Sequence, residues 1–98
     1  MAKSFVIVFN SKLGARKELA DFLNALPYVT YWYGCLPFCL FVTANATAND
    51  LFKSINEHFS ARAGKRIIIT EVGEDRQGWL PKKAWRVLKN PDDPVAPD

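Results

Sequence analysis

The sequence is poor in the residues that build metal centres and disulfide frameworks. It holds two cysteines and one histidine in 98 residues. Cys35 and Cys39 are too few for a disulfide framework, and their C-x3-C spacing lacks zinc-binding partners because His58 lies far along the chain. The two cysteines could face each other across a hairpin. We expect free, buried thiols in a reducing compartment.

Long apolar runs and catalytic motifs are also missing. No run approaches the ~20 apolar residues that a transmembrane helix needs, and the apolar residues 5–9 are too few for the core of a signal peptide. We therefore expect a cytoplasmic protein without a membrane partner. No G-x-S-x-G motif surrounds a nucleophile, and Gly73 and Gly78 do not form a phosphate-binding loop. His58 is interpreted as a partly exposed structural histidine rather than a general base.

What remains is the composition of one globular domain. Hydrophobic residues make up 49% of the chain and charged residues 23%, which is typical of a folded domain with its own core. We expect that domain to span residues 1–90. Residues 91–98 are rich in Pro and Asp, cannot bury themselves, and are expected to form a flexible tail.

The apolar patterns follow the order β-α-β-β-α-β. Apolar and β-branched runs predict strands, and a spacing of three and four residues predicts helices. The expected strands cover residues 5–9, 28–34, 38–43 and 66–72, with a break at residues 35–37. The expected helices cover residues 15–26, the stretch from Thr47 to a stop at Gly64, and a short last segment up to about residue 89. Thr47 and Asp50 have the spacing of a capping box.

This order predicts an α+β fold, a ferredoxin-like βαββαβ sandwich with a short C-terminal helix. Its sheet would be antiparallel with strand order 4-1-3-2, and both main helices would lie on one face. The other face would be apolar, covered either by the C-terminal helix or by a second copy of the chain. We favour a homodimer, with an interface that includes Tyr31, Trp32, Tyr33, Trp79 and Trp85.

Charge is distributed unevenly along the chain. All 13 Lys and Arg and seven of the ten Asp and Glu lie before residue 90, so that part carries a formal +6 and the tail −3. A basic domain is compatible with nucleic acid. The candidate phosphate contacts are Lys12, Arg16, Lys17, Lys82, Lys83 and Arg86, although a solvated helix face is the favoured explanation of the last three. The aromatic residues could stack bases, but core or dimer packing is favoured.

Asn10 occupies the place where a metal-binding carboxylate would be most useful. It follows the first strand directly, and a carboxylate there could hold a divalent ion opposite its dimer mate. Asn is a neutral, weak metal ligand. We therefore interpret Asn10 as a turn-forming residue and expect no metal or other cofactor.

The strands, together with the ending Gly78-Trp79-Leu80-Pro81-x-x-Ala84-Trp85, resemble the small bacterial proteins called SinR-like. That group is related to virulence-associated protein D and to the CRISPR-associated small endoribonucleases and integrase adaptors. The resemblance covers residues 4–90. It implies a ferredoxin-like fold, a homodimer built through sheets and an association with nucleic acid. Nuclease members usually carry an Asp after the first strand, where this chain has Asn10.

Three functions remain open from the sequence. The first is a non-enzymatic homodimeric module, an adaptor in a bacterial or phage defence, toxin or mobile-element system with weak nucleic-acid association. The second is a metal-dependent endonuclease of the CRISPR-associated type, which would need Mg2+. The third is a basic nucleic-acid-binding protein without catalysis. The departure at Asn10 favours the first.

Overall fold

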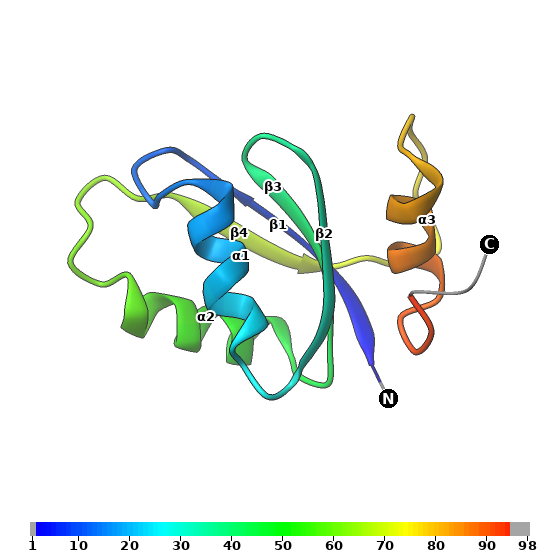
Figure 1. The fold of residues 1–98 in the computed structure, drawn as a ribbon, viewed down its shortest axis with the longest axis horizontal. Helices are drawn as coiled ribbons and strands as arrows, with labels where there is room; N and C mark the ends of the chain where they lie inside the picture. The colour runs from blue at the N-terminus through cyan, green and yellow to red at the C-terminus, as the bar shows by residue number, and fades with distance from the viewer. Residues whose placement is uncertain (1, 95–98) are drawn as a thin grey trace.

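A computed structural model describes residues 2–94. The elements follow the order β1 (Lys3–Phe9), α1 (Arg16–Asn24), β2 (Val29–Leu36), β3 (Cys39–Ala44), α2 (Ala48–His58), β4 (Ile67–Glu71) and α3 (Lys82–Lys89) (Figure 1). The predicted α+β class and the alternation of strands and helices are confirmed. Within the described residues, every helix is too short or too polar to cross a bilayer.

The four strands form one sheet in the order β2-β3-β1-β4, and each neighbouring pair is antiparallel. β1 therefore lies inside the sheet, where Ile7 faces Leu40 of β3 and Ile69 of β4. β2 and β4 are the two edges. This arrangement explains why residues 5–9 form an uninterrupted apolar run, since both neighbours and both faces of β1 are partly covered.

The first face of the sheet carries the main core. Phe5, Ile7 and Phe9 alternate along β1 and point to this face, where all three are buried. Leu23 of α1 and Ile55 of α2 pack against them. Both helices lie on the same side of the sheet, as predicted (Figure 1). Every second side chain of the strands and the apolar stripe of each helix therefore pack together in one core layer.

The second face is covered in part by α3. Ala84, Val87 and Leu88 form a smaller core with Cys39 and Phe41 of β3. At the start of β1, the Ser4 hydroxyl donates to the carbonyl oxygen of Val87 at 2.5 Å. The last helix thus lies across the sheet from the other two, with the sheet between the layers (Figure 1).

Two predicted boundaries were wrong. We expected the hairpin to break at residues 35–37, but β2 continues through Leu36 and the turn is made by Pro37 and Phe38. The pairing of β2 with β3 shifts between Tyr33 and Leu36, and this irregularity absorbs the extra residues. We also expected the second helix to stop at Gly64. It ends at His58, and Gly64, with φ +76°, makes a turn in the loop to β4 instead.

The start of α2 forms the capping box that the sequence predicted. The Thr47 hydroxyl accepts from the backbone N–H of Asp50 at 3.1 Å, and the Asp50 carboxylate accepts from the N–H of Thr47 at 3.0 Å. Those hydrogen bonds stabilise the charged carboxylate, so the pKa of Asp50 is lowered.

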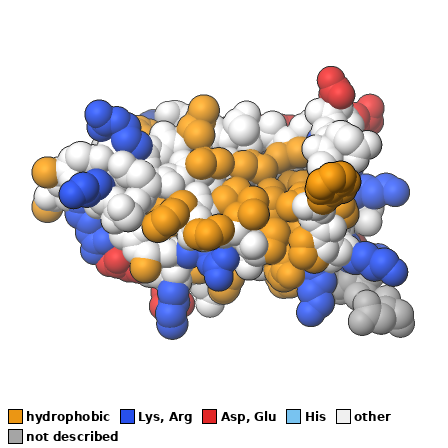
Figure 2. All heavy atoms as spheres, turned by 90° about the horizontal axis from the view of Figure 1, so that it is seen from above, with side chains coloured by type: hydrophobic (Ala, Val, Ile, Leu, Met, Phe, Trp, Pro, Cys, Tyr) orange, Lys and Arg blue, Asp and Glu red, His pale blue; other side chains and the backbone are white. Residues whose placement is uncertain are grey.

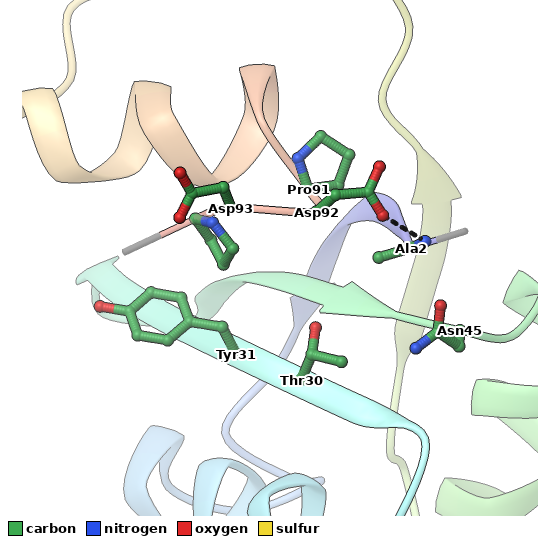
Figure 3. Close-up of a pocket in the computed structure, with 8 residues that line it drawn as sticks. Ala2, Thr30, Tyr31, Asn45, Pro91, Asp92 and Asp93 are labelled. Carbon is green, nitrogen blue, oxygen red and sulfur yellow. Dashed lines mark hydrogen bonds between the residues drawn. The ribbon is translucent and has the colours of Figure 1, made fainter. Parts of the chain in front are cut away.

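The segment after α3 turns back towards β2. Pro91 and Asp92 line a hollow of about 300 Å3 with Thr30 and Tyr31, and the Asp92 carboxylate accepts from the backbone N–H of Ala2 at 2.9 Å (Figure 3). Part of the predicted tail therefore contacts the domain. Residues 95–98 lie outside the described residues.

Candidate functional site

The side chain of Asn10 holds the end of β1 through three hydrogen bonds. Its amide oxygen accepts from the backbone N–H groups of Arg66 at 2.9 Å and Leu13 at 3.3 Å. Its amide nitrogen donates to the carbonyl oxygen of Gly64 at 3.0 Å. Asn10 therefore ties the end of β1 to the loop that enters β4, which supports its interpretation as a turn residue. A carboxylate could not make the third bond, because it has no hydrogen to donate.

The acidic side chains nearby are committed to structure. Glu18 of α1 accepts a two-pronged interaction from Arg62, which also donates to the carbonyl oxygen of Leu13 at 2.6 Å. This hydrogen bonding lowers the pKa of Glu18 and raises that of Arg62. Within residues 2–94, no three His, Cys, Asp or Glu side chains gather closely enough to hold a metal ion.

The candidate basic residues do not form one cluster. Lys12, Arg16 and Lys17 lie in the β1–α1 loop and on α1, over the first face of the sheet. Lys82, Lys83 and Arg86 lie on α3, over the second face, and all three are exposed. Lys17 pairs with Asp21 at 2.7 Å. A single phosphate-tracking patch that contains all six residues is therefore not formed within one chain.

The candidate interface aromatics are also divided. Tyr31, Tyr33 and Trp85 are half-buried in the small core under α3, whereas Trp32 packs against the main core. Trp79, just before α3, has its side chain fully exposed at 101%. Four of the five residues thus have packing roles inside the chain, and only Trp79 makes a free apolar projection.

An apolar row that sequence reasoning missed crosses the sheet on the face that carries α3, and only Cys39 of the row is buried in the core under that helix. Leu36 faces Cys39, Cys39 faces Val8, and Val8 faces Ile68, so the row runs from β2 to β4. Val8 and Leu36 are each 44% exposed and Ile68 is 61% exposed. Figure 2 shows hydrophobic side chains gathered over the middle of the molecule, with Lys and Arg around the margins. The row was hidden in the sequence because it joins four strands.

The two cysteines lie at this row and are free thiols, but the prediction that both are buried is wrong for Cys35. Cys39 is buried, and Cys35 is half-buried. Burial, with a smaller contribution from Cys35, raises the pKa of the Cys39 thiol. A raised pKa keeps the thiol protonated at neutral pH and makes it a poor nucleophile.

His58 has a packing role. Its ring stacks on Phe22 of α1, with ring centroids 4.3 Å apart and planes 20° apart, and meets Phe59 edge-on. These contacts join the end of α2 to α1. They support the interpretation of His58 as a structural residue.

Comparison with protein-family models, with curated proteins and with solved structures finds no match to this chain. The SinR-like resemblance therefore stays a prediction, and the candidate sites rest on the geometry described above.

Proposed function

We propose that the chain is a ferredoxin-like, non-enzymatic module that forms a homodimer through the open edge of β4. The observation that carries the proposal is the exposed end of the apolar row at that edge. The SinR-like resemblance adds the proposal of an adaptor role in a defence, toxin or mobile-element system.

The fold assignment is supported by the topology. Read from the β4 edge, the strands lie in the order 4-1-3-2, and the two longest helices cover one face of the sheet. A split βαβ arrangement of this kind is the hallmark of ferredoxin-like domains. In this chain, α3 is an addition on the other face.

The backbone of β4 is prepared for a further strand. The backbone N–H of Val72 donates to the carbonyl oxygen of Ser4, and the backbone N–H of Asn10 donates to the carbonyl oxygen of Arg66. Arg66 and Val72, which flank β4, therefore direct their backbone polar groups towards β1. Because hydrogen-bonded pairs alternate in an antiparallel ladder, Ile67, Ile69 and Glu71 direct theirs outwards. An edge with unpaired donors and acceptors is a template for another strand.

A two-fold axis at Ile68 satisfies that edge with a second copy of the chain. Ile67 of one copy then pairs with Ile69 of the other, and both belong to the outward-pointing set. Ile68 lies opposite its own counterpart at a non-hydrogen-bonded position, where side chains approach most closely. The exposed end of the apolar row is thereby covered, and the row continues into the second copy.

The charges along β4 favour the same antiparallel arrangement. Lys65 and Arg66 lie at its start, and Glu71, Glu74 and Asp75 lie at or beyond its end. Antiparallel pairing places the basic start of one strand beside the acidic end of the other, whereas parallel pairing would bring like charges together. Opposite charges across strands stabilise pairing, and like charges destabilise it.

Sedimentation over a wide range of protein concentration tests the dimer. We expect a reversible monomer–dimer equilibrium, because one strand pair buries less than a standard interface. A purely monomeric profile at tens of micromolar would contradict the proposal.

A charge exchange tests the β4 geometry separately. Glu71→Lys alone and Lys65→Glu alone should each weaken the dimer, because the register that pairs Ile67 with Ile69 also pairs residue 65 with residue 71. Each variant therefore places like charges at both ends of the paired strands. The double variant should recover much of the loss. If none of the three variants changes the dissociation constant, the homodimer proposal stands but β4 is excluded as its interface.

The two other functions have less support. A metal-dependent nuclease would need ligands other than Asn10, whose amide oxygen already accepts two backbone N–H groups. The proposed control is incubation with RNA and DNA in Mg2+ or Mn2+, where cleavage that Asn10→Ala abolishes would favour the nuclease. Binding of nucleic acid without catalysis has one specific observation in its favour, at the edge of β2.

A further inference from the structure

The side chain of Arg16 lies across the edge of β2, packed closely against Gly34. A Cβ atom on Gly34 would lie 2.9 Å from the Cδ and 3.2 Å from the Nε of Arg16. The guanidinium then donates through Nη1 to the carbonyl oxygen of Leu36 at 2.9 Å. The side chain is thus held against the strand, with its remaining N–H groups available to a ligand.

A hollow of about 490 Å3 opens beside this side chain. It is lined by Arg16, Lys17, Ala20, Trp32, Gly34 and Pro37. A second hollow of about 460 Å3 is lined by Asn24 and by residues 30–34 of β2, so the two share Trp32 and Gly34. The two hollows are neighbours along the β2 edge, here called the track, and the half-buried side chain of Trp32 borders both.

The charge of the track suits an anion. Within residues 2–94, no carboxylate lies within ion-pair distance of Arg16, while Lys17 shares its charge with Asp21. Arg16 also lies at the first turn of α1, whose N-cap residue Ala15 supplies no side-chain acceptor. The positive end of the helix dipole adds to the guanidinium charge, and the acid of the same first turn, Glu18, is paired with Arg62.

We infer that the β2 edge binds single-stranded nucleic acid, with a base stacked on Trp32 and the adjoining phosphate held by Arg16 and Lys17. An aromatic face accepts any base, and a guanidinium fork matches phosphate oxygens. Two hollows in series suit a chain of nucleotides better than a single one. A duplex keeps its bases stacked inside and cannot offer one to Trp32.

Fluorescence anisotropy with a labelled oligothymidine, compared with the same strand in a duplex, tests this site. We expect a preference for the single strand, an affinity that falls as salt rises, and about a tenfold loss in Arg16→Gln. Arg16→Lys should recover only part of the loss, since it restores the charge without the fork. Trp32→Phe should weaken binding less, because a smaller aromatic face remains.

The matched control is Lys53→Gln, which removes one exposed positive charge from α2. If the binding of Lys53→Gln falls as much as that of Arg16→Gln, the affinity is diffuse attraction to a basic protein and the site is wrong. Equal affinity for duplex and single strand would also overturn the inference. Because Trp32 reaches the core, circular dichroism of each variant must first match that of the parent.

Discussion

The two edge strands of the sheet, β2 and β4, differ in the elements that flank them. β4 is short, its outer edge is unpaired, and Ile68 near its start is 61% exposed. β2 is longer and lies between α1 on one face and α3 on the other, with Arg16 across its edge. A bare edge accepts another strand, whereas a flanked edge leaves room only for a narrow ligand. The positions of the helices thus determine what each edge can bind.

The largest expected effect comes from α3, the element that makes β2 unlike β4. Val87 has 0% exposure under the second face, so Val87→Asp would bury an unpaired carboxylate. We expect a loss of about 3 kcal/mol or more in the free energy of unfolding, measured in urea. Lys83→Asp, on the exposed side of the same helix, should change stability far less. Similar losses in both variants would mean that α3 is not firmly packed.

The next largest effect should fall on the bare edge. Ile68→Lys places two positive charges opposite each other in the proposed dimer and removes the apolar contact, so the dissociation constant should rise about tenfold or more. Sedimentation equilibrium measures the change. Phe52→Lys is the control, because Phe52 is 43% exposed and lies on α2, outside the proposed pairing of strands. An equal loss of dimer affinity in the control would indicate non-specific hydrophobic association.

A third change tests how β4 is held in place. Asn10→Asp loses the donor to Gly64 while it keeps the acceptor to Arg66. We expect a cost of about 1–2 kcal/mol in urea unfolding, because the carbonyl oxygen of Gly64 would face a carboxylate. Ser11→Asp adds the same charge at an exposed neighbour and controls for charge alone. A stability gain in Asn10→Asp upon addition of Mg2+ would revive the metal-site hypothesis.

The smallest effect concerns the ion pair between α1 and the loop that leads to β4. The pKa of Glu18 is lowered in the folded chain by its hydrogen bonds from Arg62, so the carboxylate stabilises the fold above its ordinary value of 4.5. That contribution is lost as the pH falls through the lowered pKa. Glu18→Gln should therefore melt slightly below the parent at neutral pH and converge with it in acid. Glu57→Gln, an exposed acid on α2, should show no such convergence.

The sequence predicted the strands and helices better than their boundaries and their contacts with one another. Apolar runs located all four strands, and the Thr47–Asp50 spacing located the start of α2, because those signals are local. The end of β2 was misplaced because residues 35–37 were interpreted as the break, although Cys35 and Leu36 belong to the strand and the carbonyl oxygen of Leu36 accepts from Arg16. That contact joins residues far apart in the chain, and no local pattern reports it.

The candidate site was predicted less well for a related reason. Asn10 was correctly interpreted as a turn residue, since its type and position suffice for that conclusion. The apolar row from Leu36 to Ile68 depends on the register of three strand pairs, and its exposure depends on how far α3 extends. Neither quantity can be obtained from periodicity alone. Trp32, which stays a predicted interface residue, also borders the track beside Arg16, and its type alone could not show that.

The bond between Ser4 and Val87 joins almost the first residue of the domain to almost the last. During synthesis the sheet can assemble before α3 has left the ribosome, and in that interval the residues that α3 will cover face water together with the bare edge. A nascent chain in this state exposes both an apolar surface and an unpaired strand to other protein chains. The helix α3 therefore covers the apolar face only at the end of synthesis. A truncated chain that lacks α3 should aggregate in cells.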